Sequence, residues 1–335
     1  MAQPTGSDLH VDAALTQISV GYKMKAENNI ADKMFPTVPV AKQSGKVFVW
    51  DKNDMMRDEA AIRAPGTESA GGGLDVTSST TYYADVVAFH KDVADQDMAN
   101  SDLGNLPIIM SEYVTQKLLI KRERDFVTNY FGVDLWADQG TPNDATGGAS
   151  STTWPYFICF SDGANSDPLG TIRTAKRKIL ETTGYLPNKL LVGVEAHDVI
   201  ALHPDVAERV KYTQGGVPDR VGMVSQPEMA ALCGIEEYLV GMTSYATNVE
   251  NETATYSFNF GKNMLLVYAA PTPSLLLPSG GYIFEWTGFN GMGQNVKMDS
   301  FYERKLESTR YEGEMAYDQK LLCSDVGIYF SGAVE

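Results

Sequence analysis

The sequence predicts an α+β protein, and three observations support this class. One long helical segment occupies residues 107–131, short apolar strands recur at positions such as 189–194 and 264–269, and helices and strands do not alternate in the regular order of βαβ units. The chain has 335 residues, 43% of them hydrophobic and 21% charged, which is enough for about two lobes of ~150 residues each. We therefore expect a folded chain with more than one core.

The first 45 residues are expected to form an arm and not a domain. A polar start, which lacks the basic and apolar stretches of a secretion signal, leads into a short helical segment at 11–18 and then into Phe35, Pro36 and Pro39. The two prolines remove backbone donors and hold the chain extended. Such a segment cannot bury itself, so we expect it to lie across the body or a neighbouring subunit. Without a secretion signal, we expect the protein to stay in the compartment where it is made.

Residues 46–94 are expected to form a long projecting hairpin. Residues 46–50 alternate in the manner of a strand, and residues 82–89 are an apolar, β-prone partner for them. The roughly thirty residues between these strands are polar or glycine-rich, and a connection of that length is normally functional or disordered. Because a two-stranded hairpin has too little core to stand alone in water, we expect this loop to be stabilised by docking.

Pro107 opens the strongest helical segment, which is expected to end near Phe131, before Gly132. At about 25 residues and 1.5 Å per residue it would be ~38 Å long, which suits a strut. Its predicted apolar face consists of Ile109, Tyr113, Gln116, Ile120, Val127 and Phe131. Its predicted polar face consists of Lys117, Lys121, Arg122, Arg124 and Asp125.

A second lobe is expected to begin at Asp167, a helix N-cap followed by Pro168, with the helix running to Thr183 and ending at Gly184. Further short helices are predicted at 198–202, 204–212 and 226–232. Strands are predicted at 189–194, 238–242, 264–269 and 283–286, with two or three more over 296–330.

The charge and the cysteines limit the classes of function. The net charge of −16 argues against a DNA-binding surface, because phosphate neutralisation needs clustered Lys and Arg. Solubility alone would explain the acidic charge. A role as the wall of a container that must not adhere to enclosed nucleic acid would explain it equally well. The longest apolar run, 264–270, is shorter than a membrane span. Cys159, Cys233 and Cys323 lie far apart and are expected to be free thiols.

No motif in the sequence predicts catalysis, a cofactor or a metal site. The chain lacks a phosphate-binding GxxxxGK[ST] loop and a GxSxG nucleophile elbow. Of the four histidines, only His197 and His203 are close in sequence, and a spacing of six does not place two ligands on one helix face. We therefore predict that the protein is not an enzyme, with no catalytic, cofactor-binding or metal-binding residues.

Three groups of segments carry a family resemblance. They are 32–40 followed by 45–50, then 63–68, and then 187–193 with 203–212. In this order they resemble the major capsid protein of tailed bacteriophages, which has the HK97-like or Johnson fold. The likeness spans nearly the whole chain. The three groups resemble, in order, the arm-to-loop junction, the extended loop and the core of the axial domain in that family.

The resemblance implies a specific division of the chain. It implies an N-terminal arm (1–45), an extended loop (46–94), a peripheral domain (95–166 with 295–335) built on a spine helix at 107–131, and an axial domain (167–294). It implies pentamers and hexamers that tile an icosahedral shell around phage double-stranded DNA, in the virion and, during assembly, in the bacterial cytoplasm. The implied partners are a separate scaffold protein, a portal, and cement or decoration proteins.

The resemblance also implies contacts between subunits. The residues expected to make them are Phe35, Pro36, Trp50, Arg57, Arg63, Glu68, Glu123 and Arg124. We hypothesise that the loop charges Arg57, Arg63 and Glu68 pair with Glu123 or Arg124 of an adjacent subunit, although solvated loop charges explain the sequence equally well. Some family members crosslink a loop lysine to a neighbour's asparagine, and Lys52 lies in the corresponding loop.

Three alternatives stay open at this point. An encapsulin-type nanocompartment shell would share the fold but package enzymes. A tail or decoration protein is disfavoured by the combination of a long loop and a long helix. An α+β hydrolase would require a nucleophile and a base that converge only in space, which sequence alone does not exclude.

Overall fold

The computed structural model describes residues 28–78, 80–100, 106–138, 140–148, 153–213, 224–249, 252–273, 277–290 and 296–335. The short helix expected at 11–18 lies outside them. The helices are α2 (Ala31–Met34), α3 (Lys52–Met56), α4 (Asp95–Asn100), α5 (Leu106–Tyr130), α6 (Pro168–Thr183), α7 (Val194–Leu202), α8 (Pro204–Thr213), α9 (Gln226–Cys233), α10 (Thr287–Asn290) and the 3-10 turn η2 (Ser324–Val326). The strands are β1 (Thr37–Val40), β2 (Ser44–Lys46), β3 (Val49–Trp50), β4 (Val76–Thr77), β5 (Thr81–Tyr83), β6 (Asp85–Ala94), β7 (Ala137–Asp138), β8 (Thr141–Pro142), β9 (Ala145–Gly148), β10 (Tyr156–Ile158), β11 (Lys189–Gly193), β12 (Glu237–Gly241), β13 (Ser244–Ala246), β14 (Tyr256–Phe258), β15 (Met264–Val267), β16 (Gly281–Trp286), β17 (Lys297–Glu303), β18 (Ser308–Leu321) and β19 (Gly327–Ser331).

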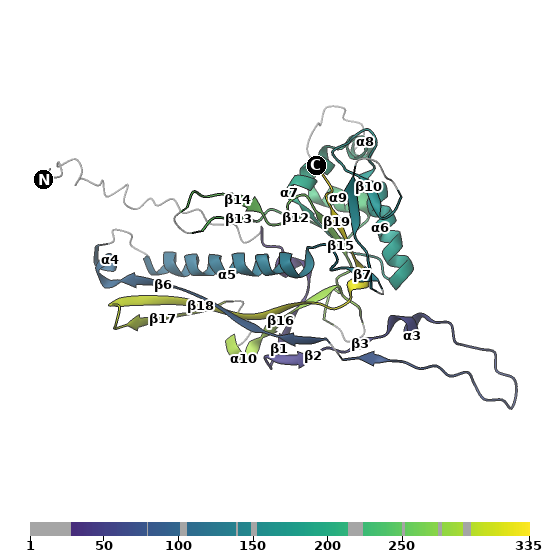
Figure 1. Cartoon of the computed structure of the whole chain (residues 1–335), viewed down its shortest axis with the longest axis horizontal. Coiled ribbons are helices and arrows are strands. Elements are labelled where there is room, and N and C mark those ends of the chain that lie inside the picture. Colours follow the sequence, from purple (N-terminus) through teal and green to yellow (C-terminus); the bar gives the residue numbers. More distant parts are fainter. Residues whose placement is uncertain are drawn as a thin grey trace.

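A long sheet and the helix α5 form one half of the molecule (Figure 1). Strand β18 is the centre of this five-stranded sheet, with β6 along one side and β17 followed by β16 along the other, and β1 pairs with β16. Helix α5 lies along the sheet (Figure 1). Gly313 on β18 allows the close approach, because a Cβ there would lie 2.7 Å from Val114 Cγ1 and 2.8 Å from Leu118 Cδ1.

The predicted ends of the long helix agree with α5 to within one residue, but its predicted faces were only partly right: Val127 and Phe131 pack into the core, and others do not. Ile109 and Tyr113 are 37% and 41% exposed, whereas Arg122, which was assigned to the polar face, is 2% exposed. The face that packs inward consists of Val114, Leu118, Arg122, Glu123, Phe126 and Tyr130. Two charged residues on the buried face distort the apolar periodicity on which the prediction depended.

A six-stranded sheet, in the order β10-β9-β19-β15-β11-β12, forms the centre of the other half. Alternate residues of its strands point to opposite faces, so Leu190 and Val192 belong to a core that includes residues of α6, α7 and α9. Leu191 and Leu265 belong to a second core, which α5 shares with the long sheet. The six-stranded sheet therefore joins the two halves.

The helix caps and the short elements predicted for the second half are confirmed by the structure. Asp167 caps helix α6 by accepting the N–H of Gly170 at 2.8 Å, and Gly184 ends it in the left-handed conformation (φ 74°) with its N–H bonded to Leu180 O. The predicted helices and strands of this half appear as α6 to α9, β11, β12, β15 and β16, and the expected final strands as β17, β18 and β19.

The predicted hairpin pairing was only partly right. Strand β2 pairs with β5, with Lys46 opposite Thr81, and β3 pairs with β4, with Val49 opposite Thr77. Residues 85–89, expected to pair with 46–50, belong to β6 and pair with β18 instead. Sheet membership also cuts across the predicted domain boundaries, since β16 joins β18 in the long sheet while β9, β10 and β19 join the six-stranded sheet.

Candidate assembly surface

The chain between β3 and β4 projects from the body as an extended loop that begins with α3 (Figure 1). At its root, Asp54 accepts the backbone N–H of Asp75 at 3.0 Å and pairs with Arg57 at 3.0 Å. Arg57 also lies 2.8 Å from Glu59. These contacts join loop residues to one another, so they shape the loop without attaching it to the body.

Apolar side chains on the loop and its root face solvent. Ile62 is fully exposed, and the others in this set are each at least 36% exposed: Phe48, Trp50, Met55, Met56, Leu74 and Val76. A run of exposed apolar residues on a projecting element is typical of an interaction site. Because a hairpin of this kind buries little of its own surface, contact with another surface would stabilise it.

Lys52 fastens the root of the loop to the body. Its Nζ lies 2.6 Å from Asp138 Oδ1 and 3.0 Å from Asp325 Oδ2, and the three side chains are only 21–24% exposed. Partial burial lowers the pKa of Lys52, but hydrogen bonds and charge from the two carboxylates outweigh it, so the pKa is raised. A charged amine held in this way is a poor nucleophile, which disfavours the crosslinking role that the resemblance implied.

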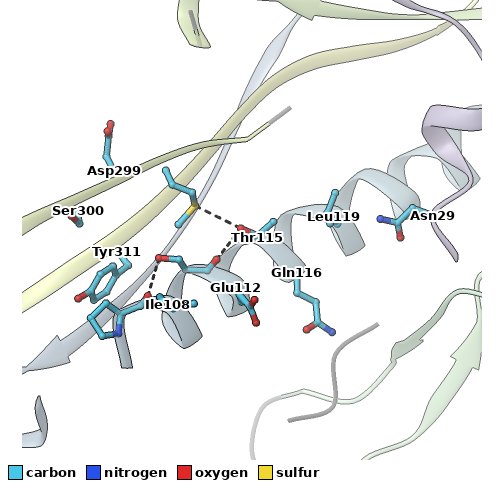
Figure 2. A pocket seen from close by; sticks show the side chains of 12 residues that line it. Asn29, Ile108, Glu112, Thr115, Gln116, Leu119, Asp299, Ser300 and Tyr311 are labelled. Atoms are coloured by element: carbon cyan, nitrogen blue, oxygen red, sulfur yellow. Dashed lines mark hydrogen bonds between the residues drawn. The ribbon is translucent and has the colours of Figure 1, made fainter. Parts of the chain in front are cut away.

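A groove of about 490 Å³ lies between the first half of α5 and strands β17 and β18 (Figure 2). Its apolar lining includes Ile108, Leu119 and Met298. Two carboxylates, those of Glu112 and Asp299, also line it, and Asp299 forms an ion pair with Lys297 at 2.7 Å. The groove therefore combines an apolar surface with charged side chains.

Sequence reasoning missed this groove. Met298 lies on β17 and lines the groove with residues of α5, nearly two hundred residues earlier, as the 3.8 Å contact between Thr115 Oγ1 and Met298 Sδ shows (Figure 2). The one available signal was Ile108, an apolar residue in the first turn of α5, where acidic residues are usual. Ile108 is 58% exposed because its side chain has no covering element among the described residues.

Two of the predicted contact residues are buried within their own chain. Phe35 is 1% exposed, and its ring centroid lies 4.6 Å from that of Tyr130. Glu123 is also 1% exposed, and its Oε1 accepts the backbone N–H groups of Ile30 and Ala31. A carboxylate in this position is not accessible to the loop of another subunit.

The other predicted contact residues lie nearer the surface. Pro36 is half-buried, and Arg57, Arg63 and Glu68 are exposed on the loop, where Arg63 Nε donates to Thr67 O at 2.5 Å. Trp50 lies at the root of the loop. Arg124 stacks over the ring of Tyr245 on β13, with its guanidinium carbon 3.8 Å from the ring centroid. The structure thus groups Trp50 and the three loop charges, and separates them from Phe35, Glu123 and Arg124.

One serine and one histidine do converge in space. Ser166 Oγ lies 3.0 Å from His203 Nε2, but Ser166 donates to Asp162 O at 2.6 Å and both residues are buried. His203 Nδ1 accepts the N–H of Asp205 at 3.3 Å, so its proton lies on Nε2 and points to the serine. In this tautomer the histidine cannot act as a base toward Ser166. Within the described residues, no three His, Cys, Asp or Glu side chains gather as a metal site.

The comparisons with known proteins agree with this architecture. No family model matches the chain. The chain is 26% identical over 341 residues to the major capsid protein of Burkholderia phage BcepMu, and the match covers 96% of both chains. By sequence and by fold, the chain is similar to phage major capsid proteins. The HK97-like α+β fold that the sequence predicted is thereby confirmed.

Solved structures with this capsid fold include a phage-related protein from Bordetella bronchiseptica RB50, with a TM-score of 0.67 at 21% identity over 96% of this chain and 95% of that one. The mature capsid of bacteriophage PhiM1 has a TM-score of 0.58 at 11% identity over 94% and 89%. The SrpI encapsulin of Synechococcus elongatus PCC 7942 has a TM-score of 0.53 at 13% identity over 97% and 96%. None of the helices that the structure describes is long and apolar enough to span a membrane.

Proposed function

We propose that the chain is a non-enzymatic capsid subunit that assembles as pentamers and hexamers into an icosahedral shell enclosing phage double-stranded DNA. The observation that carries the proposal is the projecting loop, whose exposed Ile62 and apolar root have no covering surface within the described part of the chain. The whole-length similarity to a phage major capsid protein supports the same function. The net charge of −16 suits a wall that does not adhere to the enclosed DNA.

The proposal extends to partners and location. A scaffold protein, a portal and cement proteins would act with the shell, which would form in the host cytoplasm and persist in the virion. The relative from phage BcepMu favours a virion over an enzyme-filled nanocompartment, while the similarity to an encapsulin keeps the latter as the second candidate.

Within this function, we propose that the tip of the loop docks in the groove beside α5 of a second copy. Ile62 would enter the apolar part of the groove, next to Ile108 and Met298, and Arg63 would approach Glu112 or join the ion pair of Asp299 with Lys297. The support is complementarity, since the loop offers an apolar side chain beside a cation and the groove offers an apolar surface beside carboxylates. This replaces Glu123, which is buried, as the partner of a loop arginine.

Particle contents test the function directly. The full chain would be expressed alone and together with its neighbouring genes, and particles would be examined by negative-stain microscopy and for nuclease-protected DNA. Closed particles that protect DNA when the neighbouring genes are present support the phage capsid. Closed particles that hold protein cargo instead would assign the chain to the nanocompartments.

A charge exchange tests the docking site separately. Arg63→Glu is expected to raise the subunit concentration needed for assembly about two- to fivefold, because a rim ion pair contributes ~0.5–1 kcal/mol. Glu112→Arg in the same chain should restore assembly in part, whereas Glu181→Arg, on the exposed face of α6, should not. Equal assembly by Arg63→Glu and the unmodified chain would contradict this docking site and leave the shell function intact.

A further inference from the structure

The carboxylate of Glu123 joins helix α5 to the start of helix α2. Its Oε1 accepts the backbone N–H of Ile30 at 2.7 Å and that of Ala31 at 2.8 Å. Its Oε2 is buried and has no hydrogen-bond partner among the described residues. One oxygen therefore holds the root of the N-terminal arm, and the other is the position where a proton would reside.

More carboxylates than cations surround this contact. The charged and titratable neighbours in the cluster come from four elements: Asp32 of α2, Arg122 of α5, Glu285 of β16 and Tyr317 of β18. Arg122 is 2% exposed and pairs with Asp32, which is itself about a third exposed. One buried arginine thus faces three carboxyl groups, and the charge of Asp32 disfavours ionisation of the two buried ones, Glu123 and Glu285.

Burial of the Glu123 side chain also disfavours its ionisation. Desolvation raises its pKa to about 7, and the charge of Asp32 adds to the increase, while the N–H groups of Ala31 and Ile30 and the charge of Arg122 oppose it. Burial likewise raises the pKa of Glu285. The burial of Glu123 and its buried Oε2, which has no hydrogen-bond partner among the described residues, both favour the neutral carboxyl in slightly acidic solution.

We propose that Glu123 is a proton-dependent lock on the root of the arm: residues 30–35 stay closed against α5 when the buried carboxyl is neutral, and they open more often when it ionises, because opening lets water solvate the buried charge. Beneath this contact lie Met34 and Phe35, which are 0% and 1% exposed. Lys189 adds a second attachment by donating to Lys33 O at 2.5 Å. The lock therefore changes how often this segment opens and does not by itself unfold the chain.

The direction of the pH effect follows from proton linkage. The pKa of Glu123 is higher in the closed state than in the open state, where it returns toward 4.5, so closure takes up a proton. The contribution to closure is complete below about pH 4.5 and is lost as the pH rises through about 7. Between pH 6 and pH 8 the opening constant should rise about tenfold.

Amide hydrogen exchange at Ile30 and Ala31 in the full, unassembled chain tests the proposal. After correction for intrinsic exchange rates, opening should rise about tenfold from pH 6 to pH 8 in the natural chain. Glu123→Gln keeps the accepting oxygen but cannot ionise, so its profile should be flat. Glu181→Gln, an exposed carboxylate on α6, is the matched control and should follow the natural chain.

Two results would overturn the lock. One is a tenfold rise that persists in Glu123→Gln, which would assign the titration to another group such as Glu285. The other is a flat profile in the natural chain. Should Glu123→Gln fail to fold, a carbon-13 NMR titration of the natural chain decides the matter without a variant, because a Glu123 pKa near 4.5 excludes the lock and one near 7 supports it.

Discussion

Lys52 Nζ lies 2.6 Å from Asp138 Oδ1, and this ion pair attaches the projecting loop to the body of the subunit. Asp325 completes the contact from the turn η2 at 3.0 Å. The ion pairs of Arg57 join loop residues to one another, so we expect Lys52 to contribute to the direction in which the loop leaves the subunit.

Removal of this amine should destabilise the chain. Lys52→Met leaves Asp138 and Asp325 facing each other without a cation, and we expect a loss of about 1–2 kcal/mol in the free energy of unfolding. Chemical denaturation measures this loss. Lys305→Met, at an exposed lysine, serves as the control. Equal midpoints for the two variants would show that Lys52 does not hold the loop root.

Gly313→Ala should separate α5 from the long sheet. A Cβ at this position would overlap Val114 and Leu118, and overpacking of a close contact costs about 1–3 kcal/mol. Gly71→Ala, in the loop where a Cβ meets nothing within 4 Å, should leave the unfolding midpoint unchanged. A Gly313→Ala chain as stable as the Gly71→Ala chain would mean that the helix packs less closely than described.

Phe35 and Trp50 were predicted to act alike, and the structure separates them. Phe35→Ala removes a buried ring and should lower the stability of the isolated subunit by about 3–4 kcal/mol. Trp50→Ala, at 36% exposure, should change it by less than ~1 kcal/mol but should reduce particle yield. Thermal unfolding and microscopy of both variants check this, and a reversed order of stabilities would contradict it.

The thiols should be unreactive in the folded chain. Burial raises the pKa of both Cys233 and Cys323 to about 11, so about one thiol in a thousand is ionised at pH 8, and the fraction grows as the pH rises. Burial also raises the pKa of Cys159. Iodoacetamide at pH 8 should label none of the three before unfolding and all of them afterwards. Cys323 is half-buried, and its labelling at the rate of the unfolded chain would contradict its raised pKa.

What the sequence predicted correctly was local. Pro107 and Gly132 mark the ends of α5, and Asp167 and Gly184 mark the ends of α6, because caps act within a few residues. The α+β class and the HK97-like fold were predicted correctly for a related reason, since they depend on the order of elements along the chain.

What the sequence missed depends on contacts between distant segments. Arg122 was assigned to the polar face of α5 and Glu123 to a contact with another subunit, yet Glu123 is buried and accepts the N–H of Ile30, 93 residues away. Strand β6 pairs with β18 across more than two hundred residues, which no hairpin signal indicates. The groove beside α5 arises from the packing of α5 against β17 and β18, which are far from it in sequence, so neither Met298 nor Glu112 could be recognised as part of it.

Light scattering of the full chain over a range of subunit concentrations tests the central claim most directly, because shell formation is cooperative and concentration-dependent. The account predicts a sharp transition from small species to closed particles of uniform size, or to uniform rings of five or six subunits. A chain in which residues 58–73 are replaced by a short Gly–Ser turn should remain folded and fail to make this transition. A natural chain that stays a single-subunit species at every concentration, alone and with its neighbouring gene products, would contradict it.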